Sequence, residues 1–113
     1  MAYMNKETAT KIRKAIKETF KGIKFSITVE NHSTLHVKIM ESNLFDNGVE
    51  FSYLHRDSSY LTEEQKVVVN KLHDIIREVG KYYNNSDSHT DYFDYAFYYY
   101  VGVGKWNKKH VSI

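Results

Sequence analysis

One stretch near the C-terminal end carries the residue types of a phosphate-binding loop. It reads Gly102-Val103-Gly104-Lys105 and is followed by Trp106, the only tryptophan of the chain. A phosphate loop of the P-loop type needs wider glycine spacing, then Lys and Ser or Thr at the start of a helix. Here the glycines end an alternating, strand-like run. The spacing therefore indicates a bulge or a close backbone approach and not a phosphate site.

Two histidine triplets have the residue types of acid–base catalysts. His32-Ser33-Thr34 and His110-Val111-Ser112 both read H-x-[ST]. Such a pair resembles the signature of the 2H phosphoesterases, in which each histidine moves a proton at a phosphodiester. That fold needs a longer chain with two lobes, so a 2H-like phosphodiesterase is a remote alternative. The histidines at 36, 55 and 73 form no His-x-x-x-His pair and are expected to be ordinary surface or partly buried residues.

Acidic residues gather shortly before the aromatic run. Asp87, Asp91 and Asp94 lie around His89, and such side chains can hold a metal ion. Their spacing fits no calcium loop, whereas short polar side chains also bond their own backbone in turns. We therefore expect a turn here, and no metal site, cofactor or catalytic set in the chain. The absence of cysteine excludes disulfides and thiolate chemistry.

Helix and strand patterns place these residues. Residues 6–20 repeat apolar side chains at helical spacing, with Asn5 as the expected N-cap and Gly22 as the stop. Residues 24–30 and 34–40 alternate apolar and polar side chains and are joined by Asn-His-Ser, which predicts a β-hairpin. Thr62 and Gln65 fit the capping box of a second helix. Its expected buried stripe is Val68, Leu72, Ile75, Ile76 and Val79.

A second alternating run spans residues 92–103. Its consistently apolar face carries Phe93, Tyr95, Phe97, Tyr99, Val101 and Val103. This face is predicted to lie against the helices, which leaves Tyr98 and Tyr100 outward beside the polar row of the hairpin. Residues 41–60 lack a clear period, although 49–54 is a candidate edge strand. The predicted fold is α+β: an antiparallel sheet, made of the β-hairpin and the C-terminal strand, with two helices packed on one face in the order α-β-β-α-β.

The totals limit the class of protein. A chain of 113 residues, 42% of them hydrophobic, suits one globular domain over residues 1–113. No segment has the length of a membrane span or the apolar core of a signal peptide, so we expect a soluble, cytoplasmic protein without a membrane partner. The net charge of +2 is unevenly spread. Residues 1–40 carry 8 − 3 = +5, residues 41–104 carry 5 − 11 = −6, and the tail adds +3.

Basic residues and tyrosines give two candidate binding surfaces. On a helical wheel, five basic side chains fall within an arc of about 100° beside the apolar stripe, where they could track phosphates. These are Lys6, Arg13, Lys14, Lys17 and Lys21. The outward sheet face offers Lys24, Lys38, Tyr98 and Tyr100, and rings on a basic sheet can stack single-stranded nucleic acid. The bland alternative is a solvated helix face with tyrosines that cover a sheet or a dimer contact; protein binding would use the same rings.

Two blocks of the sequence resemble a known family. ATKIRKAIKETFKGIKFSI and SDSHTDYFDYAFYYYVGVGKW are similar to the signature blocks of the large polyvalent protein associated domain, type twenty-nine. The matching positions are Ile12-Arg13, Ile16-Lys17, Phe20 and 24–27 in the first block, and Ser86-Asp87, 91–94 and Phe97-Tyr98 in the second. Lys21 stands where the family usually has proline, and no W-x-D-G-P follows the second strand.

The resemblance implies which kind of genetic element encodes the domain, and it implies no catalysed reaction. Such domains occur in phages, plasmids and conjugative elements and are thought to protect or regulate incoming DNA. We therefore expect a non-enzymatic accessory protein of a bacterial mobile element that acts by binding. The leading hypothesis is inhibition of a host defence system, such as a CRISPR or restriction nuclease, in which the acidic 41–104 region could mimic nucleic acid. The alternative is a nucleic-acid-binding accessory domain that uses the basic flank and the exposed tyrosines.

Overall fold

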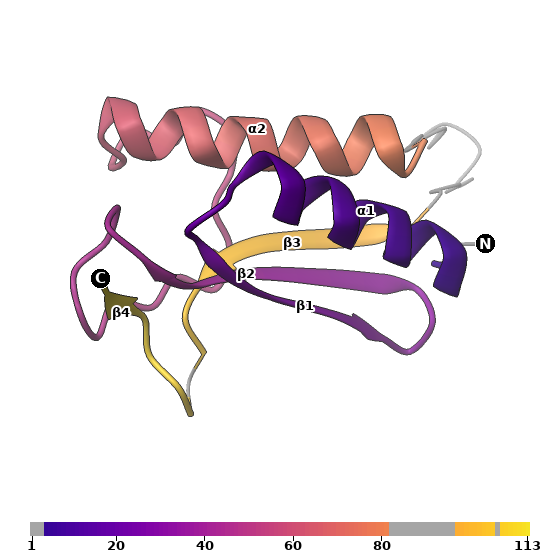
Figure 1. The fold of residues 1–113 in the computed structure, drawn as a ribbon, viewed down its shortest axis with the longest axis horizontal. Coiled ribbons are helices and arrows are strands. Elements are labelled where there is room, and N and C mark those ends of the chain that lie inside the picture. Colours follow the sequence, from indigo (N-terminus) through magenta and orange to yellow (C-terminus); the bar gives the residue numbers. More distant parts are fainter. Residues whose placement is uncertain (1–3, 82–96, 106) are drawn as a thin grey trace, which may run out of the picture.

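Two helices lie on one side of a four-stranded sheet in the computed structural model, which describes residues 4–81, 97–105 and 107–113 (Figure 1). The elements follow in the order α1 (Lys6–Thr19), β1 (Lys24–Glu30), β2 (Thr34–Ser42), α2 (Glu63–Val79), β3 (Tyr98–Val103) and β4 (Val111–Ser112). This confirms the α+β class and the α-β-β-α-β order. Among the described residues, no helix has the length and apolarity that a membrane crossing requires.

Helix α1 begins and ends where its sequence predicts. The Asn5 side chain accepts a hydrogen bond from the Thr8 backbone N–H at 2.7 Å, which satisfies one of the unpaired donors of the first turn. Ala9, Ile12 and Ile16 form its buried stripe. Phe20 is the C-cap, and Gly22 follows with a φ of +92°, a conformation that glycine adopts without steric cost.

The hairpin is confirmed in register. β1 pairs antiparallel with β2, so that Ile27 faces Val37 and Val29 faces Leu35. The apolar members of both strands point toward the helices, and Leu35, Val37 and Ile39 are fully buried. The turn between the strands holds Asn31 and His32 at φ values of 53° and 58°. Two successive left-handed residues are typical of a type I′ turn, which matches the twist of a two-stranded ribbon.

The prediction of an antiparallel sheet holds for the hairpin but is wrong for the C-terminal strand, because β3 runs parallel to β2. The sheet order is β1-β2-β3, and β3 starts opposite Thr34 and ends opposite Ile39. The reason is the long connection: α2 spans the sheet and returns the chain to the start of β2 (Figure 1). A crossover helix of this kind joins parallel strands, whereas a short turn joins antiparallel ones.

Helix α2 has the predicted capping box, but its buried face is shifted from the prediction. Thr62 accepts from the Gln65 backbone N–H, and the Gln65 side chain accepts from the Thr62 N–H. The buried residues are Val69, Leu72, His73, Ile75 and Ile76. Val68 and Val79, expected inside, are only partly buried. His73, expected on the surface or half-buried, is 2% exposed.

Residues 51–54 and β4 complete the packing around the sheet. Phe51 forms a two-way backbone bridge with Val103, and the Leu54 N–H donates to the Val101 carbonyl at 2.6 Å, so residues 51–54 lie along β3, although the edge strand predicted for 49–54 forms only this isolated bridge. β4 pairs parallel with the end of β2. Gly102 and Gly104 permit this packing, because a Cβ would lie 2.4 Å from the Phe51 carbonyl oxygen at the first and 2.7 Å from that of Val49 at the second. The predicted close backbone approach is confirmed.

Candidate binding surfaces

The outer face of the sheet is the side that the two helices leave uncovered (Figure 1). We use this name for the residues that point away from the helices along β1, β2 and β3. They are Ser26, Thr28, His36, Lys38, Tyr98 and Tyr100. Both tyrosines are 43% exposed, whereas their neighbours Val101 and Val103 are fully buried. The predicted alternation is thus confirmed for residues 97–103; Phe93 and Tyr95 lie outside the described residues.

The Tyr100 ring is fixed in position by contacts with neighbouring rings on this face. Parallel pairing sets it opposite His36, and the two rings stack with centroids 5.6 Å apart and planes 20° apart. The Tyr53 ring meets Tyr100 edge-on at 5.3 Å. The Nε2 atom of His36 is buried 3.5 Å from a Glu30 carboxylate oxygen. Because rings packed in this way lose little further freedom on binding, Tyr100 presents a preformed contact surface.

The two lysines predicted for this face do not act together. Lys38 donates from Nζ to the Ser52 carbonyl at 2.8 Å. Burial lowers the pKa of its ammonium below the ordinary value, and the nearby Glu50 carboxylate opposes that shift. Lys24 is paired with Glu41, 3.6 Å away, at the opposite end of β2 from Tyr98. Lys24 is therefore not part of one patch with the tyrosines.

The five basic residues predicted to form one strip along α1 do not share one surface. Lys6 and Arg13 line a hollow beside the hairpin, and the Arg13 Nε donates to the Ile27 carbonyl at 3.2 Å. Lys14 and Lys17 are exposed on the helix surface. Lys21 lies beyond the helix, which ends at Thr19. The helical-wheel prediction thus fails for Lys21, because the wheel assumes a helix that has already stopped.

The flank and the tyrosines lie on different sides of the molecule. α1 packs on β1 from the helix side, whereas Tyr98 and Tyr100 project from β3 on the other face. A single nucleic-acid strand that used both sets would have to pass around the edge of the sheet. The structure therefore does not bring together the surface that the nucleic-acid alternative requires.

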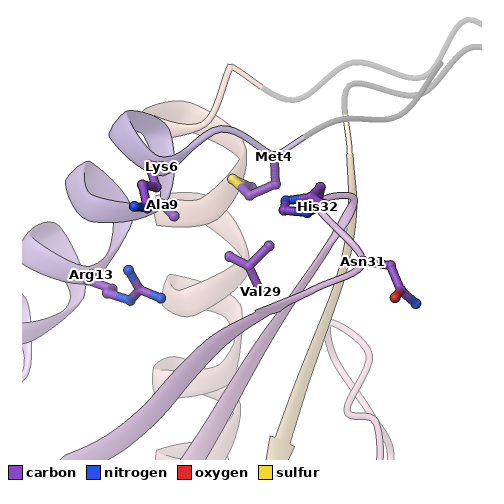
Figure 2. A pocket seen from close by; sticks show the side chains of 7 residues that line it. All are labelled: Met4, Lys6, Ala9, Arg13, Val29, Asn31 and His32. Carbon is purple, nitrogen blue, oxygen red and sulfur yellow. The ribbon is translucent and has the colours of Figure 1, made fainter.

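The hollow beside the hairpin has a volume of about 690 Å³. We call it the helix–hairpin groove. Its lining residues are Met4, Lys6, Ala9, Arg13, Val29, Asn31 and His32. Figure 2 shows the Arg13 guanidinium and the His32 ring turned toward Met4 and Val29, while Asn31 points away. The Met4 N–H donates to the His32 carbonyl at 2.7 Å, which ties the start of the helix to the turn.

The two histidine triplets lie at opposite ends of β2. His32 is exposed in the hairpin turn, whereas His110 is 2% exposed. The His110 ring lies 2.8 Å from the Ser42 hydroxyl and 3.1 Å from the Asp46 carbonyl, and the Phe45 ring meets it in a T-shaped contact with centroids 5.7 Å apart. β2 has nine residues and spans about 26 Å at a rise of about 3.3 Å per residue. Since the two histidines cannot reach one phosphodiester, the 2H-like alternative is wrong.

The other predicted motifs carry no assembled site. Gly102 and Gly104 end a strand, and the backbone of Lys105 pairs with that of Lys108 in a turn, so no helix offers its N–H groups to a phosphate. Asp87, Asp91, Asp94 and His89 lie outside the described residues. Within the part of the chain that the structure describes, no group of His, Asp and Glu is placed to hold a metal ion.

Sequence reasoning missed three residues that shape these surfaces. Tyr53 sits in a segment without a period, so nothing in the pattern places it against Tyr100. His32 was considered only for acid–base chemistry, although its position in a two-strand turn next to α1 is what brings it to the groove. His73 follows Leu72 at a position that a five-residue apolar stripe leaves out, and a full wheel of α2 would have placed it beside the core.

The fold and these surfaces define a small two-layer α+β domain with an uncovered sheet face and a basic groove. The chain belongs to the family of large polyvalent protein associated domain 29, which matches residues 3–110. This membership makes it a mobile-element-associated domain and confirms the resemblance seen in the sequence blocks. The comparisons with curated proteins and with solved structures each found no match.

Proposed function

We propose that this domain acts by binding a protein of the bacterial host through the outer face of its sheet, and that it thereby counteracts a host defence system. The observation that carries the proposal is the pair of exposed rings, Tyr98 and Tyr100, on a sheet face that no described helix covers. Tyrosine is enriched at protein interfaces, since its ring is apolar and rigid while its hydroxyl bonds at the rim.

The surroundings of the two rings support a protein partner over a nucleic acid. The neighbouring side chains carry both signs, with Glu30 and Glu50 close to His36 and Lys38. They border a hollow of about 430 Å³ whose lining also includes Lys105. A polyanionic strand prefers a surface of positive charge alone, whereas a protein surface can complement both signs.

The proposed defence role rests on the membership in this family of mobile-element-associated domains. The proposed binding surface rests on the side chains of the outer sheet face. Mobile elements must survive the nucleases of the host cell, and inhibition needs only a shaped surface that blocks such an enzyme. A partner inside the bacterial cytoplasm, such as a restriction or CRISPR nuclease, fits this role. The proposed role requires binding only and assigns no catalytic residue.

A plating assay tests the function. The domain is expressed in host strains that carry or lack a restriction or CRISPR system, and plaques of a targeted phage are counted. The wild-type domain should raise the plaque count only in the defended strain. The Tyr98→Ala/Tyr100→Ala variant should not, whereas Val67→Ala, which removes an exposed apolar side chain from α2, should behave as wild type. Equal plaque counts with and without the wild-type domain, across the host's own defence systems, would count against the role.

A further inference from the structure

The helix–hairpin groove is basic in a way that the outer sheet face is not. Three of its lining residues, Lys6, Arg13 and His32, offer cationic or protonatable nitrogen groups, and no Asp or Glu is among the described lining residues. Lys6 and Arg13 stand two turns apart on one flank of α1, and His32 approaches from the hairpin turn. Three donors from two elements thus surround one hollow.

The floor of the groove is apolar. Met4 and Ala9 are 3% and 1% exposed, and Val29 closes the side toward β1. A volume of about 690 Å³ lies within the range of sites for small ligands, which usually combine apolar walls with a few polar groups. The groove therefore suits a ligand with an apolar, ring-sized body and an anionic end.

Arg13 is preorganised for the anion. Its Nε is engaged by the Ile27 carbonyl at 3.2 Å, which fixes the plane of the guanidinium and leaves the terminal nitrogens facing the groove (Figure 2). A guanidinium in a fixed plane binds phosphate or carboxylate through two parallel hydrogen bonds. A phosphate monoester has three free oxygens and nearly two negative charges, so it matches three donors better than a carboxylate does.

The backbone at His32 gives a second, independent reason to assign a role to its side chain. His32 occupies the second central position of the hairpin turn at a φ of 58°. That position favours glycine, because a side chain there crowds the following carbonyl. This chain thus has a histidine where glycine would fold more easily, and its ring is turned into the groove (Figure 2).

We infer that the helix–hairpin groove binds a nucleoside phosphate, either a free nucleotide or the 5′-phosphorylated end of a nucleic-acid strand. The phosphate is held between Lys6, Arg13 and His32, and the base lies against Val29, with the nearly buried Met4 and Ala9 behind it. This site is separate from the tyrosine face, so it does not depend on the proposed function.

Calorimetric titration of the full chain tests the inference, with adenosine monophosphate, adenosine, inorganic phosphate, a polyglutamate peptide, and a short single strand with or without a 5′-phosphate as probes. Adenosine monophosphate should bind more tightly than adenosine, phosphate or polyglutamate. If the phosphorylated strand binds more tightly still, and its unphosphorylated twin does not, the ligand is a strand end; otherwise it is a free nucleotide.

Three variants connect the binding to the groove. Arg13→Gln should weaken binding of adenosine monophosphate about tenfold or more, because a charged hydrogen-bonded contact is lost. His32→Gly should also weaken binding while the melting temperature stays equal or rises, since the strained φ is relieved. Lys11→Gln removes the same charge from α1 outside the groove and should change nothing.

Three results would overturn the inference. One is the absence of binding by every probe at millimolar concentration. Another is polyglutamate or inorganic phosphate binding as tightly as the mononucleotide, which would reveal only unspecific attraction. The last is unchanged affinity in both Arg13→Gln and His32→Gly. The Tyr98→Ala/Tyr100→Ala variant should retain nucleotide binding, which keeps this test apart from that of the sheet face.

Discussion

The two faces of β3 differ in what they do for the molecule. On the inner face, Val101 and Val103 are fully buried, and the preceding Phe97 is 2% exposed. On the outer face, Tyr98 and Tyr100 keep 43% of their surface in solvent. Alternate residues of one strand thus point into the core on one side, and two large rings are partly exposed to solvent on the other. Two neighbouring rings with this much surface in solvent are accessible to a partner, which is why we assign them to binding.

The sharpest contrast comes from removing a ring on each side. Phe97→Ala should lower the free energy of unfolding by about 3–5 kcal/mol, because it leaves a cavity in the core. Tyr98→Ala, one residue away, should lower it by less, about 1–2 kcal/mol, since the ring keeps 43% of its surface in solvent and its loss leaves no enclosed cavity. Chemical denaturation of both variants measures the difference. Similar losses for the two would mean that the faces are not distinct.

Gly102, near the end of β3, tests how closely residues 51–52 pack against the outer face of the sheet. Gly102→Ala would place a Cβ 2.4 Å from the Phe51 carbonyl oxygen and 2.6 Å from the Lys38 Nζ. The lysine can move, but the backbone oxygen cannot move freely, so we expect a loss of about 1–3 kcal/mol in unfolding free energy. Denaturation again measures it. A neutral Gly102→Ala would show that residues 51–52 do not pack on this strand.

A polar residue in the inner layer gives a pH-dependent effect. The His73 ring lies 2.8 Å from the Leu54 carbonyl and 3.1 Å from the Tyr99 hydroxyl. Burial lowers the pKa of the imidazole below 6.5, and the charges of Arg56 and Arg77 act in the same direction, against the hydrogen bond to Leu54. The folded state therefore prefers the neutral ring.

The sign of the effect follows from which state takes up the proton. As the pH falls through 6.5, unfolded chains protonate His73 before folded ones do, so its contribution to stability is present above 6.5 and declines as the pH falls toward the lowered folded pKa. Denaturation at pH 8, 6 and 5 should show a shallower decline for His73→Gln than for the wild type. Parallel curves for the two proteins would contradict the shift.

Local features of the fold were predictable from the sequence, because they depend on neighbouring residues. The cap at Asn5, the capping box at Thr62 and the alternation along β2 all follow from side chains within a few positions of one another. The direction of β3 was not, since it depends on where a connection of several dozen residues returns the chain. The short β4 also escaped, because two residues carry no period.

The candidate surfaces divide in the same way. The outward position of Tyr98 and Tyr100 follows from alternation alone, and it was predicted. The helix–hairpin groove was not, because it joins α1 to the turn at His32 through a contact between Met4 and that turn. The basic flank was predicted as one strip, whereas only Lys6 and Arg13 line the groove. A helical wheel reports direction around one helix but not what lies opposite.

The effect of the two tyrosines on stability should be small beside that of Phe97, whereas their effect on binding should be large. The protein that co-purifies with the tagged domain from host cells, after nuclease digestion of the extract, is purified and titrated against the wild type and against Tyr98→Ala/Tyr100→Ala. We predict affinity at least about 30-fold weaker for the double variant, at the level of interface hot spots, while the melting temperature falls by only a few degrees through the lost ring contacts of Tyr100 with His36 and Tyr53. Equal affinity of the two proteins for that partner would contradict the assignment of the outer sheet face as the binding surface.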